Sequence, residues 1–510
     1  MTIRLILGDQ LNSNHSWFKK VDNSVIYFMA EMRQETDYVK HHVQKVVAFF
    51  SAMRNFSGSL KKEGHNVVYY ELDNKENTHI LTKNIELLIK KYNATAFEYQ
   101  LPDEYRLEKQ LLDFCDSIHV KTTFFDTEHF LTSRTDLASF FEGKKQFTME
   151  YFYRYMRKRY NIMMLDDKNP EGGKWNFDHN NRNKWKGEHL IPSKKDTIEN
   201  ALDIVITLEK EKIETIGKID AKRFNWPTCR KECLSILDYF CNYLLIHFGT
   251  YQDAMHTNQY YLFHSNLSFA MNSKMLHPLE VVEKVIEHWR NNKDEIDISQ
   301  VEGFVRQIIG WREYMRGMYW MKMPEYETFN KLENHNPLPD FYWTGNTKMN
   351  CLKCSIKQSL DTSYAHHIQR LMVTGNYALL TQTHPDAVDS WYLGIYADAI
   401  QWVEITNTRG MSQFADGGLV ATKPYVSSGS YINKMSNYCK DCHYKVSKKS
   451  GEDACPFNSL YWNFLDEKRN LLNGNQRMSM MYRLLDKMDR EQLVAHKERA
   501  QHIIENPNDY

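Results

Sequence analysis

The chain has 510 residues, of which 42% are hydrophobic and 25% are charged, the balance of a globular protein with an ample core. Its 65 lysines and arginines equal its 65 aspartates and glutamates in number, which excludes a protein coated in basic charge but not a local basic groove. The first residues have no signal-peptide pattern and no apolar run is long enough to span a bilayer, so we expect a cytoplasmic protein without a membrane segment.

The first part of the chain alternates short apolar runs with helical periods, which is typical of a parallel α/β sheet. Helical periodicity is clearest from about residue 34 to 62 and again at 79–92. We expect an α/β N-terminal domain over residues 1–130, with a doubly wound, five-stranded parallel sheet. The predicted strands lie at 3–9, 24–31, 66–72, 95–100 and 120–126.

Polar residues follow the first two predicted strands. Gly8, Asp9 and Gln10 come after the first strand, and Glu31 ends the second. Ligands of open parallel sheets bind beyond the carboxyl ends of the strands, so these residues border a candidate crevice. No GxGxxG motif follows the first strand, which argues against a standard dinucleotide site there.

Residues 131–200 are predicted to connect two domains. The stretch PEGGKWNFDHNNRNKWKGEH within them is rich in glycine, asparagine and charge, as loops are. Basic and aromatic residues alternate at 151–164. The simpler interpretation is an amphipathic helix over a domain seam, and the alternative is a surface for single-stranded nucleic acid. Residues 201–510 are predicted to form one large all-α domain, with long helices at 234–248, 304–320 and 364–380.

Three cysteines crowd one short polar stretch near the C-terminus, YCKDCHYKVSKKSGEDACPFN. In a reducing compartment, clustered cysteines are metal ligands more often than disulfides. Zinc with His443 as the fourth ligand is one interpretation. The Cys-Pro step and the spare pair Cys351 and Cys354 favour an iron–sulfur cluster instead, and the spacing alone leaves both open.

Several separate motifs resemble those of the cryptochrome/photolyase family, and they fall in the family's order. They are HSNLSFAMNSKMLHP (264–278), FVRQIIGWREYMRGMYW (304–320) and WYLGIYADAIQWVEITNTRGMSQFADGG (391–418). The segments LGDQLN, MNCLKCSIKQSL and YAHHIQRLMVTGNYALL, together with the CxxC…CP cysteines, are similar to one branch of that family. The branch comprises the iron–sulfur bacterial cryptochromes and the prokaryotic (6–4) photolyases, and the resemblance covers nearly the whole chain.

The resemblance implies that FAD binds in a U shape inside the helical domain. Without it, the same positions would be interpreted as a buried helix and an ordinary salt bridge. The positions that match the family's flavin-binding residues are His264, Ser265, Asn266, Leu267 and Ser268 at the diphosphate, Gln307, Trp311 and Arg312 on the flavin and substrate helix, Arg370 and Asp398 as an ion pair beside the ring, and Glu404 next to flavin N5.

The resemblance also implies light-dependent repair of (6–4) pyrimidine–pyrimidone photoproducts in UV-damaged DNA. Photoexcited reduced FAD would give an electron to a lesion flipped out of the duplex, and a histidine would give the proton. His366 matches the proton donor, and we expect its neighbour His367 to support it from the same helix. Tyr425 matches a pocket tyrosine. The positions that match an electron relay to the surface are Trp391, Tyr392 and Trp343.

The resemblance to this branch implies two further cofactors. One is a [4Fe–4S] cluster, and the other is a 6,7-dimethyl-8-ribityllumazine antenna in the N-terminal sheet. The implied cluster ligands are Cys351, Cys439, Cys442 and Cys455, with Cys354 left over. The candidate antenna residues are Gly8, Asp9, Gln10, Glu31 and Glu35.

The loop that carries the cysteines is also rich in lysine. Lysine-rich loops are usually only solvated, but here they would suit the phosphates of bound DNA. The lysines of this basic face are Lys434, Lys440, Lys445, Lys448 and Lys449.

Alternatives to (6–4) repair stay open from the sequence. They are a blue-light photoreceptor without repair and a cyclobutane pyrimidine dimer photolyase, with a zinc-stabilised nucleic-acid-binding protein more distant. The set His366, His367 and Tyr425 favours repair, because a sensor needs no proton donor. We expect a monomer in the bacterial cytoplasm that joins the nucleoid when bound to DNA.

Overall fold

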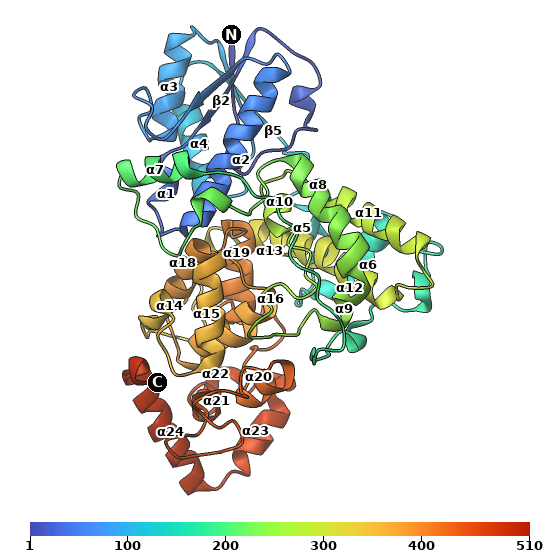
Figure 1. Ribbon diagram of the computed structural model, residues 1–510, viewed down its shortest axis with the longest axis vertical. Helices are drawn as coiled ribbons and strands as arrows, with labels where there is room; N and C mark the ends of the chain where they lie inside the picture. The colour runs from blue at the N-terminus through green and yellow to red at the C-terminus, as the bar shows by residue number, and fades with distance from the viewer.

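The computed structural model describes residues 1–510, and an N-terminal sheet domain stands at one end of a large helical body (Figure 1). The sheet has five parallel strands in the order β3-β2-β1-β4-β5, which confirms the predicted fold class. The strands are β1 (Thr2–Leu5), β2 (Val25–Ala30), β3 (Val67–Tyr70), β4 (Ala96–Gln100) and β5 (Lys121–Phe125).

Helices cover both faces of the sheet. All six residues of β2 are buried, as expected for a strand inside a parallel sheet. Tyr27 packs into the large core that continues into the helical body, whereas Phe28 packs into a separate core with α3 and α4. β1 lies at the centre, and its residue Ile3 stands opposite Ile26 and Phe97.

Two N-terminal elements differ from the sequence prediction. β1 ends at Leu5 rather than near Asp9, because a turn closes where the Leu7 N–H donates to Gln10 Oε1 at 2.9 Å. The helix predicted over 34–62 is broken between α1 (Arg33–Thr36) and α2 (Val43–Lys62), since the residues between them turn into the junction with the helical body.

The other helices make up most of the chain. They are α3 (Leu81–Lys91), α4 (Tyr105–Ser117), α5 (Asp136–Phe140), α6 (Met149–Arg159), α7 (Leu202–Lys210), α8 (Arg230–Tyr239), α9 (Leu245–Tyr251), α10 (Ser268–Asn272), α11 (Pro278–Asn291), α12 (Ile298–Val305), α13 (Glu313–Lys322), α14 (Phe341–Thr344), α15 (Asn350–Thr362), α16 (His367–Gln369), α17 (Asn376–Leu380), α18 (Pro385–Ile395), α19 (Gln401–Ile405), α20 (Gly429–Met435), α21 (Pro456–Glu467), α22 (Arg469–Leu472), α23 (Ser479–Asp486) and α24 (Arg490–Glu505).

The connecting segment contains more helix than its composition suggests. α6 buries Phe152, Tyr153 and Met156 and packs against the π-helical turn that follows α12, in agreement with an amphipathic helix at a seam. The stretch after α6 holds only short 3₁₀ turns, as its glycines and asparagines predict. No helix of the structure combines the length and the apolar composition that crossing a lipid bilayer requires.

The long helices of the helical body contain π-helical turns, which the sequence does not predict. Such turns are rare and often mark functional sites. The four turns are η5 (Phe240–Leu244), η6 (Arg306–Arg312), η8 (Arg370–Gly375) and η9 (Thr406–Ser412).

The start of α2 joins the sheet domain to the helical body. The backbone N–H of His42 donates to the Gly394 carbonyl at 2.9 Å, and its ring Nε2 lies 2.9 Å from the Leu360 carbonyl. A Cβ on Gly394 would come within 2.4 Å of the Lys40 carbonyl oxygen, so a glycine is required for this close approach.

Lys45 places a buried cation across the same junction. Its ammonium donates to the carbonyls of Leu393 at 2.6 Å and Ala399 at 2.8 Å, at the turn that leads from α18 into α19. Burial lowers the pKa of Lys45 to about 7, and the charges of Asp398 and Glu404 act in the opposite direction. Lys45 thereby holds the segment that carries two of the predicted flavin residues.

Replacing Lys45 by methionine is expected to lower the free energy of unfolding by about 2 kcal/mol, because two buried carbonyls lose their donor. Urea unfolding followed by circular dichroism measures the change. Lys61→Met is the matched control, since Lys61 is exposed on the same helix. A Lys45 variant as stable as the Lys61 variant would contradict this role.

Candidate active site

Two π-helical turns carry predicted flavin residues. Gln307, Trp311 and Arg312 lie in η6, and Arg370 opens η8. Gln307 and Trp311 are partly exposed, whereas Arg312 is buried in the opposite direction, over the Trp402 ring at 4.7 Å. The structure therefore separates Arg312 from the other two side chains of this helix.

The predicted ion pair is present. Arg370 contacts Asp398 through two hydrogen bonds of 3.0 and 3.1 Å, and its guanidinium stacks 3.8 Å from the centre of the Tyr396 ring. The amide of Asn272 donates to the Asp398 backbone carbonyl at 2.7 Å. Tyr396 and Asn272 thus fix this pair from two sides, which suits a rigid cofactor wall.

Glu404 lies in α19 and is 6% exposed. Burial raises the pKa of Glu404 well above its usual range, and the nearby charge of Asp389 raises it further. The raised pKa favours the protonated carboxyl group, which can act as a hydrogen-bond donor. Its Oε1 atom has no partner in the protein.

The two candidate histidines of the YAHHIQ motif do not share a helix. His366 precedes α16 with extended backbone angles, and His367 is the first helical residue. The predicted helix over 364–380 is thus wrong at its start. The side chain of Gln369 accepts a hydrogen bond from the backbone N–H of His366 at 3.1 Å, and this cap makes the helix begin at His367.

His366 is buried and stacks on His264, with ring centres 4.6 Å apart and planes 16° apart. Burial lowers the pKa of His366 well below its usual range, and the charges of His264, His367 and Arg370 act in the same direction. The structure thus brings the predicted proton donor into contact with the predicted diphosphate segment, and the imidazole is neutral in the resting protein.

His367 is exposed, yet desolvation by the surrounding protein lowers its pKa to about 4. Burial raises the pKa of Tyr425, and the charge of Asp178 acts in the same direction. His366 and His367 are adjacent in the sequence, whereas Tyr425 lies in a separate segment, and their joint role in one pocket stays a prediction.

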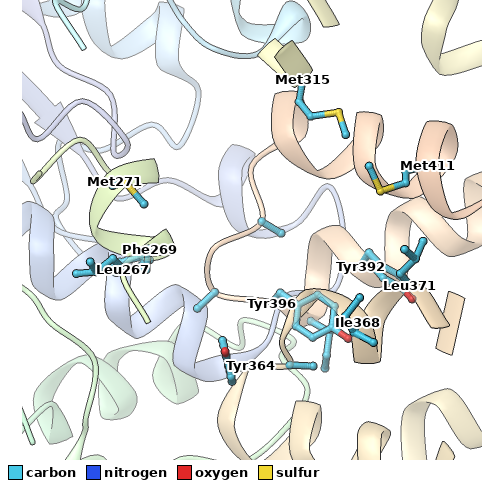
Figure 2. Packing of buried hydrophobic residues seen from close by; sticks show 14 of the residues in the cluster. Leu267, Phe269, Met271, Met315, Tyr364, Ile368, Leu371, Tyr392, Tyr396 and Met411 are labelled. Atoms are coloured by element: carbon cyan, nitrogen blue, oxygen red, sulfur yellow. The ribbon is translucent and has the colours of Figure 1, made fainter. Parts of the chain in front are cut away.

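A chain of aromatic rings leads away from the ion pair. Tyr396 lies 5.5 Å from Tyr392, Tyr392 lies 5.3 Å from Trp391, and Trp391 lies 5.1 Å from Tyr342, measured between ring centres. Figure 2 shows Tyr392 and Tyr396 side by side in the buried core. Trp343 is next in sequence to Tyr342 and is 40% exposed, and a relay through Trp391, Tyr392 and Trp343 stays a prediction.

The four predicted cluster cysteines line one cavity of about 330 Å³. Cys354 and His443 are not part of its wall; Cys354 contacts Asn350 and His443 is exposed. No group of three or more His, Cys, Asp or Glu side chains is spaced to hold a single metal ion. The cysteines that line the cavity are Cys351, Cys439, Cys442 and Cys455.

Burial raises the pKa of all the buried thiols at this cavity. Cys455 reaches about 12 and Cys439 about 11, with neighbouring thiols adding to the effect of burial. The four cysteines around the cavity offer a soft sulfur donor set, and a bound metal would favour ionisation of the three thiols whose pKa is raised, Cys351, Cys439 and Cys455. Gly429 makes room for it, since a Cβ there would lie 2.7 Å from Cys455 Sγ.

The predicted antenna residues are engaged with the protein itself. Glu31 accepts from Arg54 and from Tyr69, and Asp9 pairs with Lys274 at 2.8 Å. Gln10 bonds to the backbone of Leu7 after β1 and of Gln100 in β4, Glu35 pairs with Arg106, and Gly8 packs against Met53. These five residues lie near the carboxyl ends of the strands, but their polar atoms already have partners.

The basic face around the cysteine loop is exposed. Lys448 pairs with Asp453 at 2.6 Å. The other lysines of this face point to solvent: Lys434, Lys440, Lys445 and Lys449.

The diphosphate segment predicted at 264–268 lines a cavity of about 500 Å³ through His264, Ser265 and Asn266. Leu267 is buried in the core, and Ser268 begins α10. Its wall also contains Lys194 of the connecting segment. Neither Lys194 nor the junction residue Lys45 was singled out from the sequence, since no local pattern marks a lysine that will be buried by distant segments.

Comparisons with known proteins give a consistent picture. The family model described as deoxyribodipyrimidine photo-lyase-related protein matches residues 4–226. A (6-4) photolyase of Agrobacterium fabrum is 39% identical over 499 residues, covering 97% of each chain. An uncharacterised protein of Acanthamoeba polyphaga mimivirus is 36% identical over 94 residues, covering 18% of this chain and 69% of that protein.

The fold is also similar to that of a solved structure. A bacterial class III photolyase from Agrobacterium tumefaciens superposes with a TM-score of 0.60 at 13% sequence identity, covering 100% of this chain and 97% of that one. At this identity the likeness establishes the fold, and the near-full-length sequence relative establishes kinship.

Proposed function

Because the chain belongs to the photolyase family of its Agrobacterium fabrum relative, we propose that it is an enzyme that repairs (6–4) photoproducts in UV-damaged DNA when illuminated. The observation that carries this proposal is the 39% identity to a (6-4) photolyase over nearly the whole length of both chains. The buried histidine pair of His264 and His366 supports it, because it supplies an imidazole inside the site.

The residues present fit FAD. His264 lines a cavity, and its Nε2 atom is buried without a hydrogen-bond partner. Arg370 and Asp398 provide a fixed ion pair, and the raised pKa of Glu404 favours a carboxyl group that can donate a hydrogen bond. When bound, FAD supplies light absorption and the transferable electron. The side chains named here bind and orient it and exclude water from it.

The four cavity cysteines fit a [4Fe–4S] cluster. Four cysteines around one cavity without a histidine in its wall, with a proline directly after Cys455, favour an iron–sulfur cluster over a zinc ion held by His443. Cys351 is the fourth ligand in this proposal, and Cys354 and His443 stay outside. The cluster would join α15, the cysteine loop and the start of α21.

The five antenna residues do not form a free site for 6,7-dimethyl-8-ribityllumazine in this structure, since their polar atoms bond to the protein. We derive no step through an antenna, and the assignment of Gly8, Asp9, Gln10, Glu31 and Glu35 stays a prediction.

In the proposed reaction His366 holds the proton that the lesion accepts. Its neutral state in the resting protein means that bound, negatively charged substrate must raise its pKa before transfer. A lesion reaches His366 only when it is flipped out of the duplex. His367 and Tyr425 are the proposed pocket residues beside it, and the exposed lysines of the cysteine loop suit the phosphates that flank the lesion. We propose a monomer that acts in the cytoplasm.

Light-dependent repair by the purified, chemically reduced protein tests this proposal. One oligonucleotide carries a (6–4) photoproduct and a second carries a cyclobutane dimer, and each is kept dark or illuminated with blue light. We expect repair of the first substrate alone and only in the light, read by liquid chromatography of the digested DNA.

Three results would contradict the proposal. Repair of the cyclobutane dimer alone would mean that the chain is a cyclobutane pyrimidine dimer photolyase. Flavin-loaded protein that repairs neither would be a photoreceptor. Protein that purifies without flavin would not be a photolyase at all.

A further inference from the structure

The cavity of about 500 Å³ lies between the connecting segment and the helical body. Its wall contains Ser265 and Asn266 of the predicted diphosphate segment together with Ser193 and Lys194 of the connecting segment. The segment with Lys194 is held in place by Tyr239, whose hydroxyl donates to the Ser193 carbonyl at 2.7 Å. The connecting segment thus lies beside the diphosphate segment and is attached to α8 by this hydrogen bond.

Lys194 directs its ammonium group inward. Nζ donates to the Asn225 carbonyl at 2.8 Å and lies 5.2 Å from the Trp226 ring centre and 5.1 Å from the Tyr261 ring centre. Two aromatic faces and a carbonyl hold a cation in a fixed place, because each offers negative charge density to it.

No carboxylate neutralises this ammonium. Asp196 is the one acidic group whose charge acts on it, and the Asp196 carboxylate instead accepts from the Asn225 side-chain amide at 2.8 Å. Burial lowers the pKa of Lys194 to about 8, so the group stays mainly charged at neutral pH. A largely desolvated cation without a counter-ion is costly, and an anion in the adjoining cavity would offset that cost.

We propose that Lys194 binds the diphosphate of FAD from the side opposite Ser265 and Asn266, and that the connecting segment thereby discriminates FAD from flavins without phosphate. The assignment rests on the proposed function, since it requires that FAD is the cofactor. The aromatic cage determines the position of the charge, and the two polar residues opposite supply hydrogen bonds. The nearby Lys231, in contrast, is exposed on α8.

The test compares Lys194→Met with Lys231→Met, which removes a lysine from the solvent side of the neighbouring helix. Full-length protein is depleted of flavin, and the binding of FAD and of riboflavin is followed by quenching of flavin fluorescence at low and high salt. We expect Lys194→Met to weaken FAD binding about tenfold or more, as for the loss of one charged hydrogen bond, and to reduce its salt dependence. Riboflavin binding and the Lys231 variant should be unchanged.

Lys194→Arg keeps the charge and should retain most of the FAD affinity. This variant also tests the proposal if Lys194→Met does not fold. An arginine variant that loses FAD affinity despite a native circular dichroism spectrum would overturn the proposal. Equal FAD affinity of wild type and Lys194→Met would also overturn it, as would an equal loss for FAD and riboflavin, which indicates a structural role.

A loss of affinity for undamaged DNA with unchanged FAD binding would assign Lys194 to DNA phosphates instead, against the proposal. Wild-type protein that binds no FAD would refute the proposed function itself, and that result is distinct from a failure confined to Lys194.

Discussion

Replacing His366 by alanine is expected to reduce light-dependent (6–4) repair by about 100-fold or more, the usual contribution of a positioned proton donor. His366 is 4% exposed and stacks on His264, so no solvent molecule can easily take its place. The same variant should still bind flavin, because Arg370, Asp398 and Glu404 are untouched. Product formation per absorbed photon and the flavin content per chain are the two measurements.

A matched control for this variant is His335→Ala, which removes an exposed histidine outside the site. It should repair at the wild-type rate. Repair by His366→Ala at more than a tenth of the wild-type rate, with normal flavin content, would show that another group supplies the proton. His367 would then be the first candidate, since it is the neighbouring histidine.

Replacing Cys455 by alanine is expected to remove nearly all bound iron from the protein and to destabilise the helical body. Structural metal sites contribute on the order of 10 kcal/mol to folding, so the loss of one ligand has a large effect. Cys455 precedes α21, which packs against α24 and α17, so disorder there would spread through the C-terminal helices. Iron and sulfide analysis, visible absorption and thermal unfolding measure these changes.

Cys354→Ala and His443→Ala are the controls for the cluster, because both residues are close in sequence to ligands but outside the cavity wall. Both variants should keep their iron. Zinc in place of iron in the wild-type protein, or full iron content in Cys455→Ala, would refute the cluster assignment. Loss of iron in Cys354→Ala would instead indicate that Cys354, rather than Cys351, is the fourth ligand.

The sequence alone determined the class of the fold. Apolar runs separated by helical periods predicted five parallel strands, and the strands appear in those places because a strand buried on both faces must be apolar throughout. The sequence also determined the kinship, since motifs spread from 264 to 418 keep one order. The apolar runs are local features, and the ordered motifs add up along the chain, so both can be recognised from the sequence without the tertiary structure.

The tertiary structure decided which residues meet. Cys351 and Cys354 are equivalent by spacing, and only the orientation of α15 points Cys351 into the cavity. The π-helical turns, which follow from packing between helices rather than from propensity, set where Gln307 and Arg370 point. The start of α16 is a similar case, because a capping contact of Gln369 removes His366 from the helix.

Lys45 and Lys194 show the same limit most clearly. A lysine in a sequence is read as a solvated side chain, since its burial is costly and rare. Lys45 is buried and Lys194 half-buried because segments more than 30 positions away supply carbonyls or aromatic rings around each ammonium group. The sequence therefore determined the fold class and the chemical types available to the site, whereas long-range packing determined which charges were placed inside it.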